Sequence, residues 1–93
     1  MSEWGENVVE TKHELKTWPE YFTAVASGEK TFEIRKNDRN FQVGDRIKLV
    51  EYDPEKYEHT GRYMCADITY ITDFEQKDDY VVFGIKIKWD GRP

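Results

Sequence analysis

Apolar and polar residues alternate in four separate stretches of the chain, and this two-residue period predicts β-strands with one buried face. A fifth stretch, from Tyr63 to Thr72, is rich in aromatic and β-branched residues and is also predicted to be a strand. The alternating stretches are a short one around His13 and Leu15, followed by 31–35, 46–50 and 80–89.

The stretch 31–35 carries a polar face of particular interest. We expect Phe32 and Ile34 to anchor this strand in the core, which places Glu33 and Arg35 together on the opposite face. Their Cα atoms would be about 7 Å apart in an extended chain, near enough to share a binding partner. The alternative is an exposed ion pair that contributes less than about 1 kcal/mol.

One helix is predicted between the first two strands. Thr17-Trp18-Pro19-Glu20 has the form of a capping box, with Thr17 as N-cap and Glu20 placed to reach back to it. Gly28 supplies the left-handed residue that commonly ends a helix, so the predicted helix is about ten residues long.

The remaining segments complete a single α+β domain. We expect a flexible N-terminal tail over 1–10, one domain over 11–89 and a short tail over 90–93, with a polar loop at 53–61 and an acidic connection at 73–79. About five strands and one helix fit a small, mixed, mostly antiparallel β-barrel with the helix packed beside it.

Composition narrows the class of protein. A chain of 93 residues has room for one hydrophobic core, and its single cysteine forms no internal disulfide, so we expect a cytoplasmic protein. No membrane segment is expected, because no stretch approaches the apolar length of a membrane span. We expect no metal and no cofactor, since His13, His59 and Cys65 lie far apart and the chain has no Gly-rich phosphate loop.

The charge is unevenly distributed. The net charge of -5 argues against indiscriminate binding of nucleic acid, which requires phosphate neutralisation. Residues 28–48 nevertheless hold six basic groups against four acidic ones, whereas both flanks are acidic. The basic groups are Lys30, Arg35, Lys36, Arg39, Arg46 and Lys48.

The motif Gly28-x-Lys30-x-x-Glu33-x-Arg35, followed by Phe41-x-Val43-Gly44-Asp45, resembles the signature of the ASCH domain superfamily. The surrounding residues resemble a small bacterial and phage branch of that superfamily whose function is unknown. The resemblance extends over about residues 11–89 and implies the PUA-like fold, a β-barrel with a helix beside it. It also implies a cleft lined by Lys30, Glu33 and Arg35 that binds RNA or a nucleotide.

We therefore expect an RNA- or nucleotide-binding module. Cations would contact phosphate, and an aromatic ring from Trp18, Tyr21 or Tyr52 would stack on an unpaired base. Glu33 would accept a hydrogen bond from a base edge. Core packing is the alternative role for Tyr21. The expected phosphate contacts are Lys30, Arg35, Lys36 and Arg39.

Two alternatives remain open. The resemblance also reaches amidohydrolases that act on acetylated cytidine with a lysine, a threonine and a distant glutamate. Lys30 matches the lysine, but Glu33 occupies the place of the threonine nucleophile, Thr31 lies two residues earlier, and the glutamate is unassigned. The second alternative is a protein-interaction module that uses the loop 53–61 or the acidic segment 73–79.

Overall fold

The computed structural model describes residues 11–89, so both expected tails lie outside the described residues. The elements along the chain are β1 (His13–Thr17), α2 (Pro19–Ala26), β2 (Phe32–Lys36), β3 (Arg46–Asp53), β4 (Glu58–Thr72) and β5 (Tyr80–Trp89). The strands form one sheet in the order β1-β3-β4-β5-β2. β1 pairs with β3 in parallel, and the other three pairings are antiparallel. The predicted α+β fold with five strands and one helix is confirmed.

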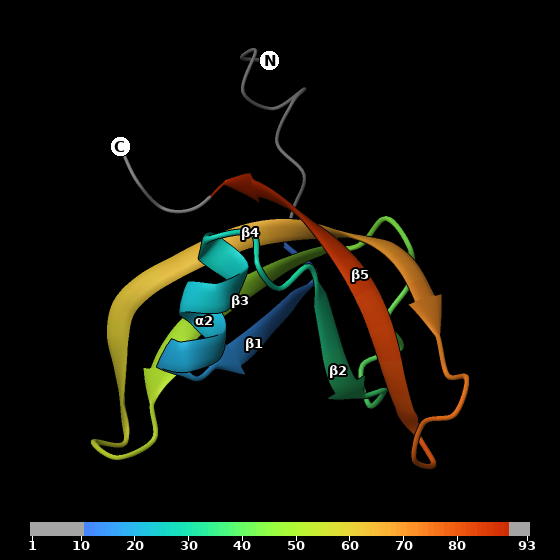
Figure 1. The fold of residues 1–93 in the computed structure, drawn as a ribbon, viewed down its shortest axis with the longest axis horizontal. Helices are drawn as coiled ribbons and strands as arrows, with labels where there is room; N and C mark the ends of the chain where they lie inside the picture. The colour runs from blue at the N-terminus through green and yellow to red at the C-terminus, as the bar shows by residue number, and fades with distance from the viewer. Residues whose placement is uncertain (1–10, 90–93) are drawn as a thin grey trace.

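The sheet curls into a half-barrel, and α2 lies on its concave side (Figure 1). The register shifts near Val50 in β3 and near Ala66 and Ile68 in β4, and such irregularities bend a strand and increase its twist. The curl does not close the barrel, because the two end strands of the sheet, β1 and β2, are not paired with each other.

The hydrophobic core fills the concave side of the sheet. Among the described strands, β2 contributes no residue to it; the inward position of that strand is taken by Glu33. The core consists of Leu15, Phe22, Val25, Phe41, Ile47, Leu49, Met64, Ala66, Ile68, Val81, Phe83 and Ile85.

The N-cap of the helix lies one residue later than predicted. Trp18, with φ -66° and ψ 150°, is the N-cap, and no side chain caps the helix there. The capping box is therefore wrong: Thr17 belongs to β1, where its buried hydroxyl donates to the Leu15 carbonyl at 3.4 Å. Pro19 stands in the first turn as predicted, and Gly28 follows the helix with φ +85°.

The predicted polar loop 53–61 is mostly a hairpin. β3 continues to Asp53 and β4 already begins at Glu58, so only 54–57 form the turn. Asp53 Oδ1 accepts hydrogen bonds from the amides of Glu55 and Lys56, which holds this turn. The hairpin projects from the body of the sheet (Figure 1), so its strands lack the apolar face on which the sequence prediction depends.

No helix among residues 11–89 has the length and apolarity that crossing a membrane requires.

Candidate functional site

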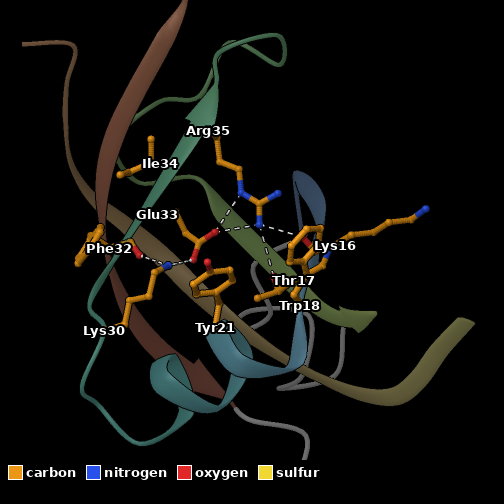
Figure 2. Close-up of a pocket in the computed structure, with 9 residues that line it drawn as sticks. All are labelled: Lys16, Thr17, Trp18, Tyr21, Lys30, Phe32, Glu33, Ile34 and Arg35. Carbon is orange, nitrogen blue, oxygen red and sulfur yellow. Dashed lines mark hydrogen bonds and ion pairs between the residues drawn. The ribbon is translucent and has the colours of Figure 1, made fainter. Parts of the chain in front are cut away.

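A cleft lies between the end of β1, the start of α2 and the edge strand β2, on the open side of the half-barrel (Figure 2). Its volume of about 550 Å³ falls within the range of small-molecule sites. It is lined by Lys16, Thr17, Trp18, Tyr21, Lys30, Phe32, Glu33, Ile34 and Arg35.

Strand β2 has the predicted alternation but the opposite orientation. Glu33 is 3% exposed and is paired in register with the fully buried Phe83, whereas Phe32 and Ile34 are 41% and 53% exposed. The expectation that these two apolar residues anchor the strand in the core is therefore wrong. The reason is that β2 borders the cleft, so its inward face meets charged groups from neighbouring segments.

Glu33 is the centre of a three-residue ionic cluster. Lys30 Nζ lies 2.6 Å from Glu33 Oε2, and Arg35 approaches Oε1 with Nε at 3.0 Å and Nη2 at 2.8 Å. Each carboxylate oxygen thus has a cationic partner, which compensates the loss of water around a buried charge. The cluster keeps a formal charge of about +1.

Arg35 also connects the two free edges of the sheet. Its Nη2 donates to the Lys16 carbonyl at 2.9 Å and contacts Thr17 Oγ1 at 3.4 Å (Figure 2). Two residues earlier on β1, the Glu14 carbonyl accepts a hydrogen bond from Arg39 Nη1 at 2.6 Å. Side chains therefore bridge the gap that a backbone ladder would close in a complete barrel.

Exposed rings form one wall of the cleft. Trp18 and Tyr21 are 50% and 47% exposed, and their nearly parallel rings have centroids 6.5 Å apart. Lys30 Nζ lies 5.8 Å from the Tyr21 centroid and 5.1 Å from that of Phe32. The wall is apolar and accessible, while the floor is charged.

The structure brings together only part of the predicted binding set. Trp18, Lys30, Glu33 and Arg35 line the cleft, whereas the other three predicted residues do not. Lys36 is exposed at the end of β2, Arg39 reaches the edge of β1, and Tyr52 lies on β3. Thr31, considered as a nucleophile, is not among the lining residues either.

Tyr21, one of the three rings expected to stack on a base, also lines the cleft, as do Lys16 and Thr17, which were not predicted as binding residues. For the two β1 residues no local signal existed, because their place depends on the parallel pairing with β3.

A second buried carboxylate, Glu51, lies outside this cleft. Arg62 donates to it from Nε and Nη2, both at 2.8 Å, and Thr60 Oγ1 donates at 2.6 Å. These hydrogen bonds, the one from Arg62 above all, hold the pKa of Glu51 below its ordinary value. Arg62 also lies over the Phe22 ring, 5.1 Å from its centroid, so this cluster fastens the hairpin to α2.

Two further carboxylates, Asp67 and Asp45, have side-chain partners near the start of β3. Arg46 lies 2.7 Å from Asp67 and lowers the pKa of that carboxyl. Burial acts to raise the pKa of Asp45, but the hydrogen bonds from His13 and the Gln42 amide outweigh it and lower that pKa. In the part of the chain that the structure describes, no group of three or more acidic, histidine or cysteine residues is arranged to hold a metal ion.

The chain has recognisable relatives. It is 41% identical over 71 residues to an uncharacterized 12.9 kDa protein in the GpA 3' region of Escherichia phage P2. The aligned part covers 75% of this chain and 63% of the phage protein, so the chain spans less than two thirds of that relative's length. Residues 12–85, which include every residue of the cleft, match the family model described as a domain of unknown function, DUF3850. The chain belongs to the DUF3850 family.

Proposed function

We propose that this protein binds an unpaired nucleotide in the cleft, either as part of single-stranded RNA or free. The observation that carries the proposal is the buried Glu33 carboxylate, which holds Lys30 and Arg35 beneath the exposed rings of Trp18 and Tyr21. A charged floor and an aromatic wall are the two features that sites for unpaired nucleotides combine.

The two cations are suited to a phosphate or a base carbonyl. Lys30 and Arg35 keep 20% and 25% of their side-chain surface exposed, although both contact Glu33. The hydrogen bonds of Arg35 to the described residues use Nε and Nη2, which leaves Nη1 for a ligand. A planar guanidinium held in this way loses little freedom when it binds an anion.

The rings are suited to a base. Trp18 and Tyr21 present their faces beside the charged floor, and stacking of a base on such a ring is worth about 1–3 kcal/mol. Because every base has a π-face, this contact gives affinity with little base preference.

Glu33 acts in this proposal as a positioning residue. Both of its oxygens already accept hydrogen bonds from Lys30 and Arg35, and its side chain is almost fully buried. The role of reading a base edge, expected from the sequence, would require it to use its remaining lone pairs.

The resemblance of the motif to ASCH domains of PUA-like fold supports a nucleotide ligand. Hydrolysis of acetylated cytidine has less support, because Thr31 does not line the cleft and Lys30 Nζ is engaged as a donor to Glu33 and to the Phe32 carbonyl. We therefore limit the proposal to binding.

Amide chemical shifts during titration test the proposal. Uridine, uridine 5'-monophosphate and a uridine tetranucleotide, together with the adenosine and cytidine equivalents, are added to the labelled protein. We expect saturable shifts in 16–21 and 30–35, with RNA and the free monophosphate distinguished by their affinities. Lys30→Gln should weaken binding about tenfold, as expected for one charge-assisted contact.

Lys86→Gln is the matched control, because Lys86 is exposed on β5 and does not line the cleft. Equal affinity of the two lysine variants, or an unchanged spectrum in 16–21 and 30–35 with every probe, would contradict the proposed function.

A further inference from the structure

The convex face of β1, β3 and β4 carries a second group of aromatic and cationic side chains. We call it the outer platform and define it as Lys16, Lys48, Tyr52, His59 and Tyr63. Tyr52 was expected from the sequence to contact the ligand, yet it does not line the cleft. Its neighbours are Lys16 and His59 of the outer platform.

The strand registers put these side chains on one face. Lys16 is level with Val50, which is paired with Tyr63, and Tyr52 is paired with His59 in the next row. Lys16 alternates with Leu15 and Thr17, both buried on the concave side, so its side chain belongs to the convex side. Figure 2 shows it pointing away from the cleft.

The platform is built from contacts between cations and rings. Lys16 Nζ lies 4.4 Å from the centroid of Tyr52, and Lys48 Nζ lies 4.4 Å from that of Tyr63. The His59 ring meets Tyr52 edge-on at 5.1 Å. The contact of an ammonium group with a ring is weaker than the stacking of a base on that ring. A base can therefore replace each lysine on its ring, and the lysine can then contact the phosphate of the same nucleotide.

The shape of this face suits an open stacking surface. A shallow hollow of about 200 Å³ lies beside it, lined by Lys48, Val50, His59 and Tyr63 together with Glu14, Glu51, Gly61 and Arg62. This volume is below the usual range for sites that enclose a small molecule. Of its acidic neighbours, Glu51 is paired with Arg62, and Glu14 is exposed and lies 3.9 Å from Lys48.

Lys16 connects the platform to the cleft. Its carbonyl accepts the hydrogen bond from Arg35 inside the cleft, while its side chain lies over Tyr52 on the other side of the same strand. β1 is an edge strand, so a chain leaving the cleft beside Lys16 reaches the platform by passing over a single strand.

We infer that the outer platform is a second stacking subsite and that the ligand is single-stranded RNA of at least two nucleotides. This inference rests on the proposed function and adds the ligand class. One nucleotide occupies the cleft, its neighbour crosses β1 with its phosphate near Lys16, and the next base stacks on Tyr52 or His59.

The test compares the affinities of mononucleotides and tetranucleotides for the same protein. The 5'-monophosphates of adenosine, cytidine and uridine and the three corresponding tetranucleotides are titrated into wild-type protein and into Tyr52→Leu. We expect the best tetranucleotide to bind at least about tenfold more tightly than its monophosphate, as one further stacked base provides. Tyr52→Leu should remove most of that advantage and leave the monophosphate unchanged.

Tyr70→Leu is the matched control, because Tyr70 is an exposed tyrosine toward the other end of β4, about 20 Å along the strand from Tyr63. His59→Ala provides a second platform variant if Tyr52→Leu perturbs the fold, as the amide spectrum reports. Lys16→Gln should make the negative slope of log affinity against log salt shallower by about 0.7 for the tetranucleotide.

The outcomes separate this inference from the proposed function. Binding of the monophosphate with no gain for the tetranucleotide, or equal effects of the Tyr52 and Tyr70 variants, would overturn the inference and leave the cleft proposal intact. A protein that binds no probe in the cleft overturns both.

Discussion

At the residue scale, the site depends on one carboxylate. Glu33 lies on the inward face of β2, where the other strands place core residues, and it is almost fully buried. A charge in that position is tolerable only because Lys30 and Arg35 approach both of its oxygens. The two cations, in turn, are held at the cleft surface because Glu33 is fixed.

Removal of the Glu33 charge should destabilise the fold. Glu33→Gln keeps the shape of the side chain but leaves two neighbouring cations without an anion. We expect a loss of about 3 kcal/mol in the free energy of unfolding, near the lower end of the range for a broken buried pair. Urea denaturation of both proteins measures it.

Glu14→Gln serves as the control, because Glu14 is exposed and 3.9 Å from Lys48, and its loss should change stability by less than about 0.5 kcal/mol. Similar stabilities of the two variants would mean that Glu33 is not held as a buried ion pair.

The second buried carboxylate should make stability depend on pH. The folded pKa of Glu51 lies below its ordinary value of 4.5, so the native state binds fewer protons than the unfolded state in that range. The contribution of Glu51 to stability is complete above pH 4.5 and is lost as the pH falls through the lowered folded pKa. Denaturation at a series of pH values should show this loss.

Glu51→Gln should remove that part of the pH dependence, so the stability difference between wild type and variant should shrink in acid. A difference that is constant from pH 6 to pH 3 would contradict the assignment. Asp45 and Asp67, whose pKa values are also lowered, contribute dependence in the same direction to both proteins.

The sequence predicted the identity of the central cluster but not the face on which it lies. Glu33 and Arg35 share one face of β2, as the alternation required, and they contact each other. The alternation alone assigns the apolar residues inward, which fails here because β2 borders a cleft. The cleft beside β2 is formed with Lys30 and the end of β1, and neither belongs to the alternating pattern of β2.

At the element scale, the two edge strands face each other across the cleft without a backbone ladder. Arg35 and Arg39 reach the carbonyls of Lys16 and Glu14, which are two residues apart on β1. The position of β1 beside the cleft is thus controlled by side chains on one side and by its parallel pairing with β3 on the other.

Arg35→Lys should loosen β1 without unfolding the protein. A lysine keeps the charge but lacks the fork with which Arg35 contacts Glu33 and the Lys16 carbonyl together. We expect faster amide hydrogen exchange in 13–17 and unchanged exchange in the centre of β4. Arg62→Lys, the control, should accelerate exchange only around the β3–β4 hairpin; unchanged exchange in 13–17 in Arg35→Lys would disprove the bridging role.

At the start of α2, one substitution should raise the stability of the helix and abolish ligand binding. Trp18 occupies the N-cap position with suitable backbone angles but has no capping side chain. Trp18→Asp should therefore stabilise the helix by about 0.5–1 kcal/mol, through the cap and the helix dipole. The same change removes the ring from the cleft, so nucleotide binding should be lost.

Thermal denaturation and titration of Trp18→Asp beside Trp18→Leu check this prediction. The leucine variant should lose binding without the gain in stability. If the aspartate variant is no more stable than the leucine variant, the missing N-cap side chain does not reduce the stability of the protein.

Element boundaries were predictable where one face of a strand meets the core. The last strand was predicted at 80–89, and Tyr80–Trp89 is observed, with Val81, Phe83 and Ile85 buried. The hairpin 53–61 was not predictable in the same way, because it projects from the sheet and its residues are polar. Its strands are fixed by pairing between Tyr52 and His59 and between Asp53 and Glu58.

At the scale of the whole molecule, a net charge of -5 coexists with a cationic cleft and platform. If the ligand is RNA, as proposed, long-range repulsion by the acidic surface opposes its binding, whereas the cations of the cleft and the platform attract it. The fold class was predictable from the number of strands and the single helix. The opening between β1 and β2 was not predictable, because it depends on how far the complete sheet curls and whether its two end strands meet.

The affinity for a tetranucleotide should fall as salt rises. If the Lys30–Glu33–Arg35 cluster, with its charge of about +1, and Lys16 each neutralise one phosphate, log affinity should fall with a slope of about -1.4 against log salt, at about -0.7 for each contact on a single strand. Titrations between 50 and 200 mM salt, as a rough working range, measure the slope. A slope near zero would mean that stacking, without phosphate contacts, accounts for binding.

The arginine bridges across the open barrel bear on how the family can diversify. In a closed barrel, backbone hydrogen bonds fix the strand spacing, so the length of one side chain has little effect on it. Here two arginine side chains span the mouth of the cleft in place of a backbone ladder, so a substitution at position 35 is expected to change the mouth while the sheet stays paired. Relatives whose side chain at this position cannot reach β1 are expected to have a wider mouth and to accept bulkier ligands on the same scaffold.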